Sequence, residues 1–161
     1  MPQMTLLGWF HTILGVLSLV TVFYTLFKYK IISFSQFSGK VYLFLTVAVA
    51  VSALGIYNQG GFGIAHLLAV LTLLAVMGGL VMEKFELFRS FSKYFQALAY
   101  TSTVLFHMIP AITDFLRRLP VDDPFADSFD DPLIIGFYIL FLIIYFLGLV
   151  FQMKWLSTEE L

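Results

Sequence analysis

Long apolar stretches alternate with short polar links along the chain. There are five such stretches, and each is near the ~20 residues that a helix needs to cross the hydrocarbon core of a bilayer. Their apolar positions are continuous rather than alternating, whereas the strands of a membrane barrel alternate. The expected spans are residues 4–27, 41–57, 62–82, 94–116 and 133–153, and the link 83–93 is expected to lie at the membrane interface. The pattern predicts an all-α fold: an integral membrane bundle of five transmembrane helices, with residues 1–161 forming a single transmembrane domain.

Composition supports the bilayer as the main solvent. Of the 161 residues, 60% are hydrophobic and 12% are charged, whereas soluble domains are about half apolar and about a quarter charged. A water-soluble domain of this size could not bury so much apolar surface. The net charge of −1 argues against nucleic acid as a partner. The chain has no cysteine, so disulfides, thiolate nucleophiles and cysteine metal sites are excluded.

Basic residues indicate an orientation, because they concentrate on the cytoplasmic side. The links 28–40 and 83–93, together with the C-terminal tail, carry seven of them: Lys28, Lys30, Lys40, Lys84, Arg89, Lys93 and Lys154. The opposite side carries two, Arg117 and Arg118. We therefore expect the N-terminus outside and the C-terminus in the cytoplasm, in a bacterial inner membrane.

Ionisable side chains inside membrane spans are costly and usually functional. The expected spans contain four: His11, His66, His107 and Asp114. A helix rises about 1.5 Å per residue, which places the three histidines roughly 6, 9 and 3 Å outside the midplane, all on the same side. Three helices thus offer imidazoles at similar depth, which favours a shared site in the outer half of the bilayer.

Converging imidazoles suit a transition metal or haem iron. Neutral histidine is a ligand for Zn, Cu and Fe, and two opposed histidines can hold haem b. The expected ligands are His11, His66 and His107. Three polar residues on the helix face of His107 are expected to support them: Tyr100, Thr103 and Asp114. Hydrogen bonding across helices, or a proton or substrate pathway, would account for the same residues.

Several short motifs resemble a known family. They are Gly39-Lys40-Val41-Tyr42, Gly55-Ile56-Tyr57, Gly60-Gly61-Phe62-Gly63 leading to His66, His107-Met108-Ile109-Pro110, Thr113-Asp114 and Arg118-Leu119-Pro120. Together they resemble the small bacterial polytopic membrane proteins known as domain of unknown function 2306. The resemblance implies a multi-helix membrane protein with helix-borne histidines and supplies no reaction. Ser35 stands where many members carry a histidine.

These observations favour a haem- or metal-binding membrane protein, with electron transfer as its possible activity. Three alternatives remain open from the sequence. One is a non-enzymatic assembly subunit, since small-residue helix faces suit packing against a membrane protein partner or a second copy. Another is a membrane hydrolase that uses a zinc-bound water. The third is transport, against which stand the single buried acid and a helix number that is small for a monomeric carrier.

Overall fold

The structure is a computed structural model that describes residues 4–57 and 61–158. The described residues form five long helices: α1 (Leu6–Tyr29), α2 (Phe37–Leu54), α3 (Ile64–Phe85), α4 (Ser92–Arg118) and α5 (Pro132–Thr158), with the short 3₁₀ helix η1 (Arg89–Phe91) before α4. All five are long and apolar enough to span a bilayer. The expected all-α membrane bundle is confirmed, and the protein is an integral membrane protein.

The helix ends depart from the expected bounds for local reasons. α1 begins after Thr5, whose side-chain oxygen accepts from the Gly8 backbone N–H at 3.1 Å. α5 begins at Pro132, a residue suited to the first helical position, and the Asp131 carboxylate accepts from the Leu133 N–H at 2.9 Å. α2 begins at Phe37, four residues before its continuous apolar run. Helices therefore extend past their apolar runs into the polar links.

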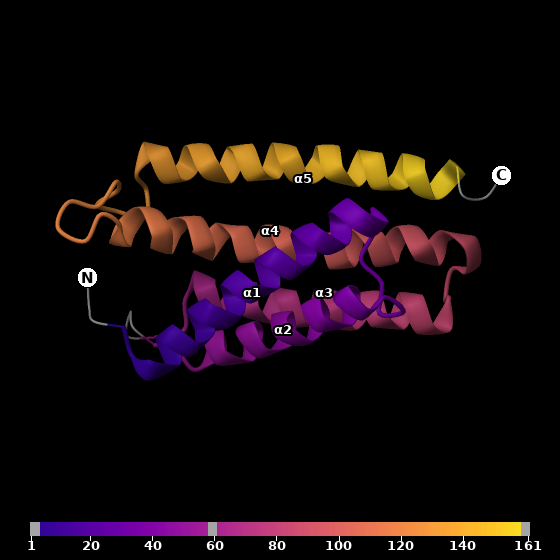
Figure 1. The fold of residues 1–161 in the computed structure, drawn as a ribbon, viewed down its shortest axis with the longest axis horizontal. Helices are drawn as coiled ribbons and strands as arrows, with labels where there is room; N and C mark the ends of the chain where they lie inside the picture. Colours follow the sequence, from indigo (N-terminus) through magenta and orange to yellow (C-terminus); the bar gives the residue numbers. More distant parts are fainter. Residues whose placement is uncertain (1–3, 58–60, 159–161) are drawn as a thin grey trace.

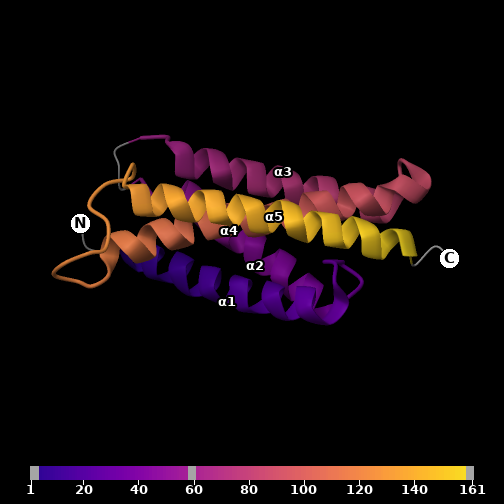
Figure 2. The ribbon, with the colours of Figure 1, turned by 90° about the horizontal axis from the view of Figure 1, so that it is seen from above.

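Successive long helices run up and down along the length of the molecule (Figure 1). The N-terminal end of α1 and the loop between α4 and α5 lie at one end, which we call the N-terminal end of the bundle. The C-terminal end of α5 lies at the other end of the bundle, with the α3–α4 link, and we call this the C-terminal end (Figures 1 and 2). α1 packs along α2, α2 along α3 and α3 along α4, while α5 packs mainly against α4.

The interior shared by α1–α4 is polar as well as apolar. Several hydroxyl-bearing side chains at its centre are completely buried, namely Ser18, Tyr42, Thr46, Tyr100 and Thr103. Large apolar side chains cover the outside, where they would face lipid. In lipid, hydrogen bonds and close packing rather than the hydrophobic effect hold helices together, so this distribution suits a membrane fold.

Candidate functional site: a buried polar column

The first part of the polar interior is built around His11, in the second turn of α1. Its Nδ1 lies 3.1 Å from the carbonyl oxygen of Val49 and 3.0 Å from the hydroxyl of Ser52, both on α2. Because a carbonyl oxygen only accepts, the hydrogen-bond network assigns the proton to Nδ1. The lone pair of the neutral ring is therefore on Nε2.

His107 on α4 supplies the second imidazole, and it is buried. Its Nε2 lies 3.1 Å from the hydroxyl oxygen of Thr46 on α2. The same hydroxyl lies 3.2 Å from that of Ser18 on α1. Thr46 and Val49 stand three residues apart on α2, so His107 and His11 contact neighbouring turns of the same helix. Three helices thus bring two of the expected histidines into one polar cluster.

Tyr42 continues the cluster one turn before Thr46 on α2. Its hydroxyl lies 2.6 Å from the hydroxyl of Thr103, which itself donates to the backbone carbonyl of Tyr100 at 2.6 Å. Since the Thr103 proton is used in that bond, Tyr42 is the donor to Thr103. The Tyr42 ring also meets the His107 imidazole edge-on, with centroids 6.2 Å apart.

Glu83 forms the opposite end of the polar interior, in the last turn of α3. Its carboxylate accepts from the Tyr100 hydroxyl at 2.9 Å and from the Phe34 backbone N–H at 2.9 Å. The Ser33 hydroxyl and the Ser35 backbone N–H also donate to it. Four donors from the α1–α2 link and α4 therefore hold one carboxylate near the C-terminal end of the bundle.

A close helix contact fixes the Tyr100 ring in this arrangement. Tyr100 is fully buried, and it lies directly against Gly79 on α3. A Cβ atom at Gly79 would stand 2.2 Å from Cε1 of that ring, well inside contact distance. Gly79 is therefore required for Tyr100 to reach Glu83.

We call the whole set the polar column. Its members are His11, Ser18, Tyr42, Thr46, Ser52, Glu83, Tyr100, Thr103 and His107. Sequence analysis singled out only some of them as candidate site residues. It assigned Glu83 to an interfacial link, expected Tyr42 to be an aromatic anchor at the inner membrane interface, and gave no role to Thr46; Tyr42 is instead fully buried. The signal for Tyr42 and Thr46 was their i, i+4 spacing on α2, which places both on one helix face.

His66, the third expected ligand, lies apart from the other two. Its Nδ1 accepts from the Gly63 N–H at 3.1 Å at the start of α3. Its ring lies against Tyr57 and Phe62, with centroids 4.6 and 5.0 Å away. Its Nε2 is buried and has no hydrogen-bond partner within the described residues. His66 therefore occupies a small aromatic site outside the polar column.

The remaining expected residues are placed as follows. Tyr100 and Thr103 bond to Glu83 and Tyr42 rather than to a histidine. Asp114 lies 3.2 Å from the Nε atom of Arg118, one turn away, and its side chain is 53% exposed. In residues 4–57 and 61–158, no three His, Asp or Glu side chains are grouped to hold a metal ion. A metal or haem site on the three histidines stays a prediction.

Comparison of the chain with protein-family models, with curated proteins and with solved structures finds no match. The resemblance to domain of unknown function 2306 therefore also stays a prediction, and the function has to be argued from the residues themselves.

Proposed function

We propose that the polar column relays protons across the membrane between the histidine pair and Glu83. The supporting observation is that titratable groups stand at both ends of a chain of buried hydroxyls. Hydroxyl groups and neutral imidazoles both donate and accept, so each can receive a proton on one side and release one on the other. Intramembrane chains of acidic residues and histidines are characteristic of proton pathways in pumps and transporters.

The relay has three hydrogen-bonded segments. The first joins His107 to Thr46, and the second, one helical turn away on α2, joins Tyr42 to Thr103. The third joins Tyr100 to Glu83. A backbone carbonyl accepts a hydrogen bond but passes no proton onward, so the Thr103-to-Tyr100 bond does not connect the second segment to the third. A rotated hydroxyl or an intervening water molecule must complete this step, which we place as the slowest in the relay.

The distribution of basic residues gives the proposed relay an orientation in the membrane. The histidine pair lies toward the N-terminal end and Glu83 near the C-terminal end. With the Lys- and Arg-rich end in the cytoplasm, His11 would face the outside and Glu83 the cytoplasm, so an inward proton gradient would load protons at His11 and release them at Glu83.

Proton flux in proteoliposomes tests the proposal. The purified protein is reconstituted around a trapped pH-sensitive dye, and a potassium diffusion potential drives protons inward. Thr46→Val removes the hydroxyl that joins His107 to the column and keeps the side chain's shape. We expect flux to fall by about 5- to 160-fold, because a lost buried hydrogen bond costs about 1–3 kcal/mol and each 1.36 kcal/mol on a barrier is tenfold in rate.

Thr72→Val is the matched control. Thr72 is also a buried threonine, but its hydroxyl donates to Leu68 within its own helix. The proton flux of the Thr72→Val variant should stay within twofold of the flux of the unaltered protein. Equal flux in Thr46→Val and the unaltered protein would overturn the relay, as would flux no higher than that of protein-free liposomes.

A bound cofactor is the second candidate, and one observation favours it. His11 donates Nδ1–H to a carbonyl and keeps its lone pair on Nε2, which is how a metal-ligating histidine is commonly held. A second nitrogen would have to come from His107, whose Nε2 already faces Thr46. Elemental analysis and a visible absorption spectrum of the protein purified from membranes test this function. Cofactor binding predicts either one equivalent of metal or a Soret band in the unaltered protein, and His11→Ala should abolish that signal.

A further inference from the structure

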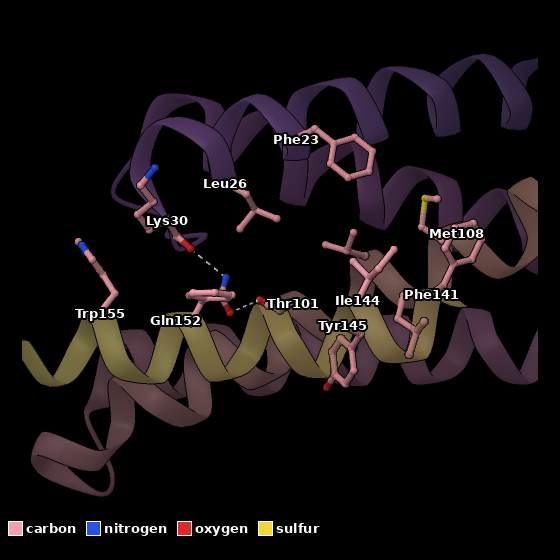
Figure 3. Close-up of a pocket in the computed structure, with 14 residues that line it drawn as sticks. Phe23, Leu26, Lys30, Thr101, Met108, Phe141, Ile144, Tyr145, Gln152 and Trp155 are labelled. Carbon is pink, nitrogen blue, oxygen red and sulfur yellow. Dashed lines mark hydrogen bonds between the residues drawn. The ribbon is translucent and has the colours of Figure 1, made fainter. Parts of the chain in front are cut away.

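An apolar groove opens on the side of the bundle away from the polar column. It lies between α1 and α5, has α4 as its floor and encloses about 550 Å³. Its walls are almost entirely apolar and include Phe23, Leu26, Met108, Phe141 and Ile144 (Figure 3). Ligand pockets for small molecules span about 300–1,000 Å³, so the groove is large enough for a chain-like apolar ligand.

The groove exists because α5 packs mainly along α4 and leaves a gap toward α1. A side-chain bridge at one end of the groove ties the three helices together. The Thr101 hydroxyl donates to Gln152 Oε1 at 2.8 Å, and Gln152 Nε2 donates to the Lys30 carbonyl at 2.9 Å (Figure 3). The bridge holds the gap at a fixed width.

The length of the groove matches one leaflet. Its lining residues on α5 run from Phe141 to Trp155, which is about 21 Å at 1.5 Å per residue. Half of the ~30 Å hydrocarbon core is about 15 Å, and the headgroup region adds several ångströms. The groove therefore reaches from the C-terminal end of the bundle to near the middle of the bilayer.

The end of the groove at the membrane surface carries a cation and an interfacial aromatic residue. Lys30 and Trp155 lie together there, while Met108 and Phe141 lie at the other end (Figure 3). The exposed Lys30 ammonium donates to the Phe27 carbonyl at 2.8 Å, and an ammonium group has three N–H donors. Tryptophan is enriched at the level of lipid headgroups. This end suits a negatively charged headgroup.

We propose that the groove binds one acyl chain of an anionic phospholipid from the leaflet at the C-terminal end, with its phosphate at Lys30. A glycine on α5 offers a direct test. Gly148 lines the groove, and apart from its chain neighbours and the nearby backbone of α5 no described atom lies within 4 Å of the place where its Cβ would stand. Gly148→Leu therefore fills the groove without a clash inside the chain. Gly136→Leu is the matched control, because Gly136 is equally open and lies on α5 outside the groove.

Native mass spectrometry measures the binding, with the protein in detergent and equal amounts of phosphatidylglycerol and phosphatidylcholine added. We expect the unaltered protein and Gly136→Leu to retain one phosphatidylglycerol in preference to phosphatidylcholine. Gly148→Leu should retain at least fivefold less. Lys30→Gln should abolish the preference between the two lipids, whereas Lys28→Gln, which alters a lysine outside the groove, should preserve it.

Two outcomes would overturn the proposal. Equal phosphatidylglycerol retention by Gly148→Leu and Gly136→Leu would mean that the lipid binds the general surface. A dimer that Gly148→Leu disrupts, with no lipid retained by the monomer, would mean that a second copy covers the groove. Circular dichroism melting of each variant verifies folding, and neither outcome depends on proton flux.

Discussion

Two adjacent glycines on α3 should respond in opposite ways to the same substitution. Gly79 lies directly against the buried Tyr100 ring, whereas a Cβ placed at Gly78 has no described atom within 4 Å apart from its chain neighbours and the nearby backbone of α3. We predict that Gly79→Ala destabilises the protein and that Gly78→Ala leaves it unchanged or slightly more stable. Both variants gain the same helix propensity, so the difference between them measures the contact with Tyr100.

The magnitude follows from the geometry at Tyr100. A methyl group 2.2 Å from Cε1 forces the ring to move by more than 1 Å, and overpacking of this kind costs about 1–3 kcal/mol. The displaced hydroxyl also loses its 2.9 Å bond to Glu83, and a hydrogen bond to a charged group is worth about 1.5–3 kcal/mol. Replacing a helical glycine by alanine also stabilises the folded helix by about 0.5–1 kcal/mol, and this gain is the same in both variants. Gly79→Ala should therefore lose about 2–5 kcal/mol, while Gly78→Ala should gain up to about 1 kcal/mol.

Thermal unfolding in detergent, followed by circular dichroism at 222 nm, measures the difference. Gly79→Ala should melt well below the unaltered protein, and Gly78→Ala at or slightly above it. The double variant Gly79→Ala/Tyr100→Leu should recover part of the loss, since the smaller side chain removes the clash. Equal melting temperatures for the two alanine variants would refute the packing of α3 against Tyr100.

Three further substitutions test separate contacts. Glu83→Gln keeps one acceptor oxygen but turns an amide donor toward groups that themselves donate, so it should cost about 1–3 kcal/mol in thermal unfolding. Gln152→Leu removes two hydrogen bonds, one to Thr101 and one to the α1–α2 link. An interhelical hydrogen bond in a membrane contributes about 0.6 kcal/mol on average and about 1.7 kcal/mol at most, so losing two should cost about 1–3 kcal/mol. Asp114→Asn breaks the pair with Arg118, and because both groups are partly exposed the unfolding free energy should change by less than about 1 kcal/mol.

The helices could be predicted from the sequence because the bilayer imposes a length and an apolar composition on each span. The same rule explains the errors in their bounds. α2 extends four residues before its apolar run because Gly39 packs against the Ser33 backbone, where a Cβ would stand 2.1 Å from the carbonyl oxygen. That contact depends on the path of the α1–α2 link, so the start of α2 could not be predicted from the hydropathy of the sequence.

The polar column could be predicted only in part. A stripe at helical spacing on α4 correctly indicated that Thr103 and His107 share a buried face. Glu83 was missed because its donors lie 17 to 50 residues away in the chain. His66 was grouped with the other histidines because depth along a helix is readable from sequence, whereas the direction in which a side chain points is set by packing. Similar depth in the membrane is therefore not sufficient evidence that ionisable side chains on different helices contact one another.

α4 connects the two proposed sites and also separates them. Successive residues on a helix point about 100° apart, so Thr103 and His107 face the column while Thr101 and Met108 line the groove. The two activities should consequently be separable by mutation. Gly148→Leu, which fills the groove, should leave proton flux unchanged, and Thr46→Val should leave phosphatidylglycerol retention unchanged. If Gly148→Leu instead lowered flux as much as Thr46→Val did, α4 would have to move when the lipid leaves, and the column and groove would be one coupled site.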